Sequence, residues 1–261
     1  MKYKIILIFL FFSIDLRAQY LCRTDIMNKE ELIPVDKTQY FRSYNFSNLW
    51  LKTDNRLVYG IIGDEHQRIL IKILTVVKNP DNANEYLVKG KSSVKENVCD
   101  FNGKITIKEI KESRRTRFGL DNEFKDKGIK TQGLLTAKYE FFEDKSQKHV
   151  GAFYGVVKTK WYVNKENEIT YDDMNIESDG YFNNAFVGIW KRYGAKIEKK
   201  CNWGDYRVPA SNCDFDIGTA EFNVAQKYCK YGWLDVALSH MAPNFSIIES
   251  GKKEILKQWW L

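Results

Sequence analysis

The chain has 261 residues, with 41 Lys and Arg against 34 Asp and Glu, and a formal net charge of +7. Aromatic residues make up 15% of it and prolines number only 4, a composition that excludes a disordered or collagen-like chain. The lysines alternate with apolar residues along most of the chain instead of forming one basic stripe, so nucleic acid is not an expected partner.

The first nineteen residues have the three parts of a secretory signal peptide: a basic start at Lys2 and Lys4, an apolar run over residues 5–12, and a small residue at Ala18. The apolar run is about half the roughly twenty residues that a membrane-spanning helix requires. We therefore expect residues 1–19 to be removed near Ala18 and the mature protein to be secreted or periplasmic, without membrane contact afterwards.

Most of the middle of the sequence alternates apolar and polar residues with a period of two. From residue 68 to residue 78, for example, Ile69, Ile71 and Ile73 share one face while charged residues punctuate the other. This period predicts β-strands over residues 68–78, 86–95, 104–111, 134–143, 151–163 and 186–193. Turn-forming clusters predict hairpin connections at residues 79–82, 100–103, 143–146 and 164–167.

Consecutive hairpins without helical crossovers predict an all-β, antiparallel fold. Long strands with one apolar face favour closure, because closure removes exposed edges. We expect a meander of eight strands over residues 20–200, closed into a calycin-like barrel or a strongly curled sheet. Gly155 and Gly188 lie within strands, where a missing side chain permits close approach of the backbone. Residues 201–261 are expected to form a small extension of loops and helices packed on the barrel, with helical spacing over residues 221–233.

Five cysteines remain after cleavage of the signal, and three of them lie in the last quarter of the chain. An odd number in an oxidising compartment leaves at least one thiol unpaired or shared between chains. Cys201, Cys213 and Cys229 are the candidates for a disulfide, and the alternative is that they are small buried apolar residues. There is no Cys-x-x-Cys pair and the histidines are isolated, so the sequence predicts neither a metal site nor another cofactor.

The run from residue 201 to residue 221 is the densest in side chains that suit a ligand. Trp and Tyr offer flat apolar faces, while Asp, Asn and Arg supply directed hydrogen bonds. The ligand-binding candidates are Trp203, Asp205, Tyr206 and Arg207, together with Thr159 and Trp161 on an interior strand. A compact, disulfide-pinned loop would have a similar composition, and that structural interpretation stays open.

No motif of a known catalytic chemistry is present, and three functions remain open. The first is a non-enzymatic protein that binds a small molecule or an accessory partner at the open end of the barrel. The second is a carbohydrate-active hydrolase that pairs Asp205 with Asp214, Asp216 or Glu221, since glycosidases need two carboxylates. The third is a surface module for protein–protein interaction, which docks on a partner through the tryptophans of its tail.

Two resemblances add to these hypotheses. Gly188-Ile189-Trp190 resembles the Gly-x-Trp element of lipocalins, which implies a barrel with a Trp closing one end. The segments at residues 60–69, 97–107 and 201–209 are similar to an uncharacterised family of small secreted proteins from Gram-negative bacteria. That similarity implies the periplasm or the cell exterior and carries no activity with it.

Overall fold

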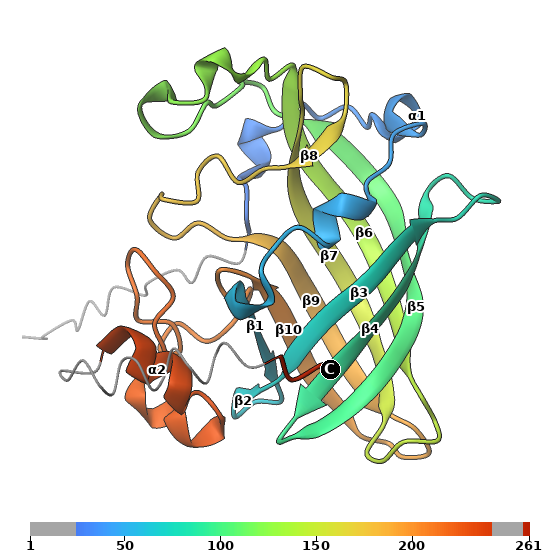
Figure 1. Ribbon diagram of the computed structural model, residues 1–261, viewed down its shortest axis with the longest axis vertical. Helices are drawn as coiled ribbons and strands as arrows, with labels where there is room; N and C mark the ends of the chain where they lie inside the picture. The colour runs from blue at the N-terminus through green and yellow to red at the C-terminus, as the bar shows by residue number, and fades with distance from the viewer. Residues whose placement is uncertain (1–24, 242–257) are drawn as a thin grey trace, which may run out of the picture.

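The computed structural model describes residues 25–241 and 258–261. One strongly curled, antiparallel sheet of ten strands forms a half-barrel (Figure 1), so the predicted fold class is confirmed. The expected signal peptide, Cys22 and residues 242–257 lie outside the described residues. Within the described part, no helix is long and apolar enough to cross a membrane.

The strands are β1 (Val58–Ile62), β2 (Gln67–Arg68), β3 (Leu70–Lys78), β4 (Glu85–Val94), β5 (Asn97–Glu112), β6 (Thr131–Glu143), β7 (Gly151–Val163), β8 (Ile169–Tyr171), β9 (Asn183–Arg192) and β10 (Glu198–Asp205). They are ordered β2-β1-β10-β9-β7-β6-β5-β4-β3, and β8 pairs with β7. The α-helices are α1 (Thr38–Phe41) and α2 (Leu234–Met241). The 3-10 turns are η1 (Lys29–Glu31), η2 (Ser47–Trp50), η3 (Asn55–Leu57), η4 (Leu120–Asn122), η5 (Lys125–Lys127) and η6 (Gln226–Tyr231).

All six strands that the alternation predicts are present, and β5 is much longer than expected. The predicted turn at residues 100–103 is wrong, because these residues lie inside β5 and the hairpin turns at residues 95–96 instead. The strands β1, β2, β8 and β10 are additions to these six, so the sheet has ten strands where eight were expected, and β10 crosses the expected boundary at residue 200. The helical spacing over residues 221–233 corresponds only to η6, and α2 begins after it.

The two edges of the sheet approach each other at a seam between β1 and β3. The chain passes from β1 through β2 directly into β3, and the Ile69 N–H donates to the Gly60 carbonyl at 3.0 Å. A Cβ at Gly60 would lie only 2.8 Å from the Ile69 carbonyl oxygen. The glycine therefore permits the close approach that brings the edges together.

Aromatic side chains fill the interior of the half-barrel. Trp161, Trp203, Tyr86 and Tyr139 are among its largest fully buried residues, and the rings of Phe186 and Trp203 stack at 4.7 Å. Burial of each Phe-sized side chain contributes about 1.5–3 kcal/mol. Over the strands that the structure describes, the interior is therefore a packed core.

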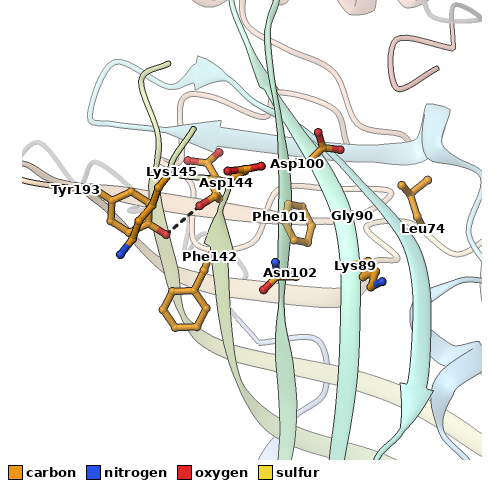
Figure 2. A pocket seen from close by; sticks show the side chains of 11 residues that line it. Leu74, Lys89, Gly90, Asp100, Phe101, Asn102, Phe142, Asp144, Lys145 and Tyr193 are labelled. Atoms are coloured by element: carbon orange, nitrogen blue, oxygen red, sulfur yellow. Dashed lines mark hydrogen bonds between the residues drawn. The ribbon is translucent and has the colours of Figure 1, made fainter. Parts of the chain in front are cut away.

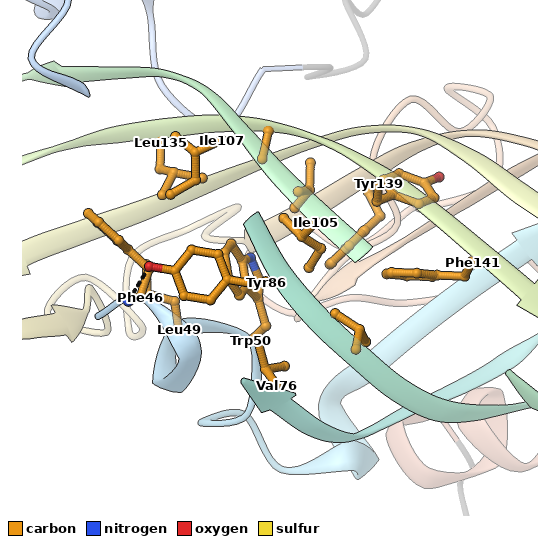
Figure 3. Packing of buried hydrophobic residues seen from close by; sticks show 14 of the residues in the cluster. Phe46, Leu49, Trp50, Val76, Tyr86, Ile105, Ile107, Leu135, Tyr139 and Phe141 are labelled. Carbon is orange, nitrogen blue, oxygen red and sulfur yellow. Dashed lines mark hydrogen bonds between the residues drawn. The ribbon is translucent and has the colours of Figure 1, made fainter. Parts of the chain in front are cut away.

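Residues 46–53, which we call the plug, enter one end of this core. Phe46, Leu49 and Trp50 of the plug are buried in the same cluster as the strand residues, and Figure 3 shows them beside Tyr86. The Phe46 N–H donates to the Tyr86 hydroxyl at 3.2 Å. The plug thus fills one end of the half-barrel with the chain's own side chains.

The C-terminal extension packs against the outer side of β1 and forms a second core, as Figure 1 shows in orange. Phe215 and Trp233 are fully buried there, with Tyr59 of β1. His66, in the turn after β1, joins the two parts: its Nδ1 contacts the Asp64 carbonyl at 2.9 Å. Its Nε2 accepts the N–H of Asn212 at 3.2 Å, and its own carbonyl accepts the Trp233 indole N–H at 2.8 Å.

The cysteines do not form the predicted bridge. Cys201 and Cys229 are free thiols, as is Cys99, so no disulfide joins any two of the three candidates. Cys201 lies fully buried in the main core, which supports the alternative of a small buried apolar residue for this position. Cys213 is disulfide-bonded, and its partner is therefore neither of the other two candidates.

Candidate functional site

The carboxyl group of Asp205, at the end of β10, is the centre of a buried polar cluster. Three donors converge on its Oδ2: the Thr53 hydroxyl at 2.7 Å, the Tyr171 hydroxyl at 2.9 Å and the Asn184 amide at 2.7 Å. These donors come from the plug, β8 and β9. One buried carboxyl thus ties the plug to three strands of the sheet.

The cluster extends from Asn184 into the plug. The Oδ1 of Asn184 accepts from the Thr159 hydroxyl at 2.8 Å, and that hydroxyl accepts the Trp50 indole N–H at 3.2 Å. The amide nitrogen of Asn184 also donates to the Leu49 carbonyl at 2.8 Å. Of the predicted ligand residues, the structure therefore brings Thr159 and Asp205 into one network, but their partners are other protein groups.

Burial dominates the electrostatics of this cluster. Desolvation raises the pKa of Asp205 to about 7, although its three hydrogen bonds favour the ionised form. Desolvation, together with the Asp205 charge, also raises the pKa of Tyr171. The backbone beside the cluster is strained, with φ of 44° at Asn184 and 70° at Tyr206. Such strain persists only where the surrounding contacts hold it.

The space around Asp205 is small. A pocket of about 30 Å³, lined by Trp50, Thr53, Asn184, Trp203 and Asp205 among others, opens there. One water molecule occupies about 30 Å³ in the liquid. Asp205 can therefore exchange a proton or hold a water, but a sugar ring does not fit beside it.

The acidic residues of the hydrolase hypothesis have separate sets of partners. Asp216 is ion-paired with Arg207 and accepts the N–H groups of Gly218 and Asn223 at 3.1 and 3.2 Å. Arg207 also donates to the carbonyls of residues 218–220. Arg207, which was predicted to bind a ligand, therefore stabilises the loop that contains Asp216.

The other predicted residues are likewise engaged in packing or exposed. Asp214 is ion-paired with Lys227, and Glu221 is exposed. The ring of Tyr206 lies edge-on to that of Tyr181, with ring centres 5.3 Å apart. Trp161 is fully buried in the core, where it contacts Phe41 with ring centres 4.8 Å apart. Trp203 belongs to the main core and also forms part of the wall of the small Asp205 pocket.

A larger hollow, which we call the tail groove, lies outside the sheet near the seam and has a volume of about 870 Å³. Its walls come from η3, the β2–β3 junction, the β4–β5 hairpin, α2 and the last residues of the chain. Its apolar members are Leu70, Val98, Leu234, Leu238, Trp259 and Trp260. Its charged members are Arg56, Arg68, Lys95 and Lys230 against Glu96 and Asp235. Asn55 lines both the tail groove and the Asp205 pocket, so the two hollows are neighbours.

Two further hollows lie on the surface. Figure 2 shows one of about 800 Å³, where Phe142 and Tyr193 stand near the Lys145 side chain. Glu143 at its floor accepts from Ser92, Trp190 and Gly151, so its polar atoms are already engaged. A third hollow, of about 710 Å³, is polar and mixes arginines with acidic residues on the outer side of β5 to β7.

Within the described residues, no group of three or more His, Cys, Asp or Glu side chains is placed to hold a metal ion.

Sequence reasoning missed most of the Asp205 cluster and, apart from the tryptophans of the tail, all of the tail groove. Thr53, Tyr171 and Asn184 are far apart in the chain, and only the fold brings them together. One signal was available: the pair Asn183-Asn184 begins an otherwise apolar strand. Amides at such positions need buried partners.

Comparison of the chain with protein-family models, with curated proteins and with solved structures found no match.

Proposed function

We propose that this is an exported, non-enzymatic binding protein that holds a small molecule in the tail groove. The observation that carries the proposal is the contrast between a filled interior and an open groove outside it. The pocket that reaches the core has room for about one water. The tail groove, at about 870 Å³, is within the roughly 300–1,000 Å³ typical of ligand sites.

The chemistry of the groove also supports binding. Ligand sites combine apolar and aromatic walls with a few polar groups that orient the ligand. The tail groove has two tryptophans, four aliphatic side chains and several cations. The rings of Trp259 and Trp260 meet edge to face at 5.8 Å, which presents two differently oriented apolar surfaces.

Export is the part of the proposal that rests on the sequence alone. Residues 1–19 have the basic, apolar and small-residue parts of a signal peptide. The hydrolase alternative has less support, because Asp205 and Asp216 have separate partners and the Asp205 pocket is too small for a sugar. A binding role therefore accounts for more of the geometry than a catalytic one.

Native mass spectrometry of the mature protein, purified from the medium or periplasm of its own cells, tests the proposal. We expect an adduct of small-molecule mass on the wild type and its loss in Trp260→Ala. The control is Tyr40→Ala, which changes an exposed aromatic residue on α1 and should retain the adduct. An absent adduct in the wild type, or one that survives in Trp260→Ala, would overturn the assignment of the groove.

A further inference from the structure

We propose that the ligand of the tail groove is an anionic amphiphile, a single acyl chain with an acidic head group. This inference rests on the proposed function and names the class of its ligand. The acyl chain lies along the apolar wall, and the head group lies at the lysines of the rim.

The apolar wall of the tail groove is partly open to solvent. Leu234 is 56% exposed and Val98 is 38% exposed, and both line the groove with Leu70, Leu238 and the two tryptophans. Contiguous apolar surface on a soluble protein marks a site of interaction. Four aliphatic side chains and two tryptophans line the groove, and together they offer an apolar surface along which a hydrocarbon chain can lie.

The charged groups leave an excess of positive charge at the rim. Arg56 forms an ion pair with Asp54, and Arg68 forms one with Asp235 at 2.5 Å. In the part of the chain that the structure describes, Lys95 and Lys230 have no acidic partner. Both are exposed, so they can turn toward a carboxylate without breaking an existing ion pair.

The Lys230 ammonium lies 5.0 Å from the Tyr231 ring centre, and two further cations with defined contacts lie near these lysines. The Arg68 Nη1 donates to the Gly232 carbonyl at 3.2 Å as well as to Asp235, and its guanidinium lies 5.2 Å from the Trp233 ring centre. The Nε of Arg68 has no hydrogen-bond partner. The Lys72 ammonium lies 4.9 Å from the Trp260 ring centre. Cationic side chains therefore lie beside the apolar wall, with Glu96 and Asp235 as the acidic members of the groove, and these cations would attract the head group of an acidic amphiphile.

Quenching of tryptophan fluorescence by a bromine-labelled stearate tests this inference in the full-length protein. Bromine quenches on contact, so a chain beside Trp259 and Trp260 should reduce the emission in a saturable way. We expect the extra quenching to disappear in Trp259→Phe/Trp260→Phe. The methyl ester of the same acid, which lacks the charge, should bind roughly tenfold more weakly.

The head-group assignment is tested by reversing the two free lysines. Lys95→Glu/Lys230→Glu should weaken binding of bromostearate by roughly tenfold and remove much of its salt dependence, because salt screens exposed charges. The matched control is Lys125→Glu/Lys127→Glu, which makes the same charge change on exposed residues of η5. It should bind as the wild type does.

The outcomes separate the two proposals. If native mass spectrometry shows a groove-dependent adduct but bromostearate does not quench, the binding function stands and the acyl class is overturned. If stearate and its ester bind equally, or if the two charge-reversal variants behave alike, the acidic head group is overturned. If the protein binds vesicles of an anionic phospholipid but no monomeric acid, the groove is a membrane contact and the proposal of a single-chain ligand is wrong.

Discussion

The amide nitrogen of Asn184 lies 2.7 Å from Oδ2 of the buried Asp205 carboxyl group. The same amide group accepts from Thr159 and donates to the Leu49 carbonyl. A single side chain in β9 thus connects a titratable group in the sheet with the backbone of the plug. Ionisation of Asp205 should therefore affect how tightly the plug is bound to the sheet.

The contribution of Asp205 to the free energy of unfolding should decrease as the pH rises from about 4 to about 7. Its pKa is about 7 in the folded protein against 3.8 for an ordinary aspartate, so the folded state binds more protons in this window. The loss is complete above pH 7, where both states are ionised, and is on the order of 4 kcal/mol. Urea unfolding of the wild type and Asp205→Asn at several pH values measures it. The difference between the two curves isolates Asp205 from other titrating groups, and parallel curves would contradict the assignment.

Asn184→Ala should destabilise the protein by about 2–4 kcal/mol. The change removes one donor from Asp205 and leaves the Leu49 carbonyl and the Thr159 hydroxyl without this partner, and each buried unsatisfied group costs about 1–3 kcal/mol. Hydrogen exchange should increase first in residues 46–53, because the amide anchors that segment. Uniform exchange over the whole sheet would instead show that Asn184 contributes only to global stability.

The hydroxyl of Tyr139 should contribute nothing to stability. It is buried without a hydrogen-bond partner, and a Cβ at Gly155 or Gly188 would lie 2.6 Å from it. Tyr139→Phe should therefore leave the unfolding free energy unchanged or raise it by up to about 1 kcal/mol. Gly188→Ala should lower it by about 3 kcal/mol or more, because the added carbon also meets the Tyr154 carbonyl oxygen at 2.0 Å. Chemical denaturation measures the unfolding free energy of both variants. A lower value in Tyr139→Phe would show that the hydroxyl stabilises the fold.

The docking of the extension should weaken as the pH falls below about 6.5. Burial lowers the pKa of His66 from its usual 6.5, so the folded state prefers the neutral ring and its stabilising contribution is lost on acidification. Protonation also removes the acceptor for the Asn212 N–H. Hydrogen-exchange protection factors over residues 208–236, which correct for the slower intrinsic exchange at low pH, should fall in the wild type as the pH drops. His66→Asn keeps a residue that tolerates φ of 58° at this position and should lose that pH dependence.

Among the cysteines that the structure describes, three should react with an alkylating reagent in the unfolded, unreduced protein: Cys99, Cys201 and Cys229. In the native protein Cys99 and Cys201 should be protected, because both are buried and desolvation raises their thiol pKa values. Peptide mapping by mass spectrometry gives the labelled positions. Labelling of Cys213 without reduction, or a peptide that links Cys201 to Cys229, would contradict this thiol assignment.

The alternation of Ile, Val and aromatic residues determined the sheet and most of its strands. A period of two places one set of side chains on a single face whatever the rest of the chain does, so β3, β4, β6, β7 and β9 were predictable. The short β1 and the charged β10 carry too little alternation for this, and their pairing with each other and with β2 and β9 identifies them as strands.

The same sequence could not show that the half-barrel is filled. Whether Phe46, Leu49 and Trp50 enter the barrel or cover its outside depends on contacts with Tyr86 and Thr159, which are distant in the chain. The tertiary structure likewise decided that Asp205 has buried partners and that Trp260 lies beside Lys72. Local periodicity determines which face of a strand is apolar, whereas the way that face is covered depends on long-range packing.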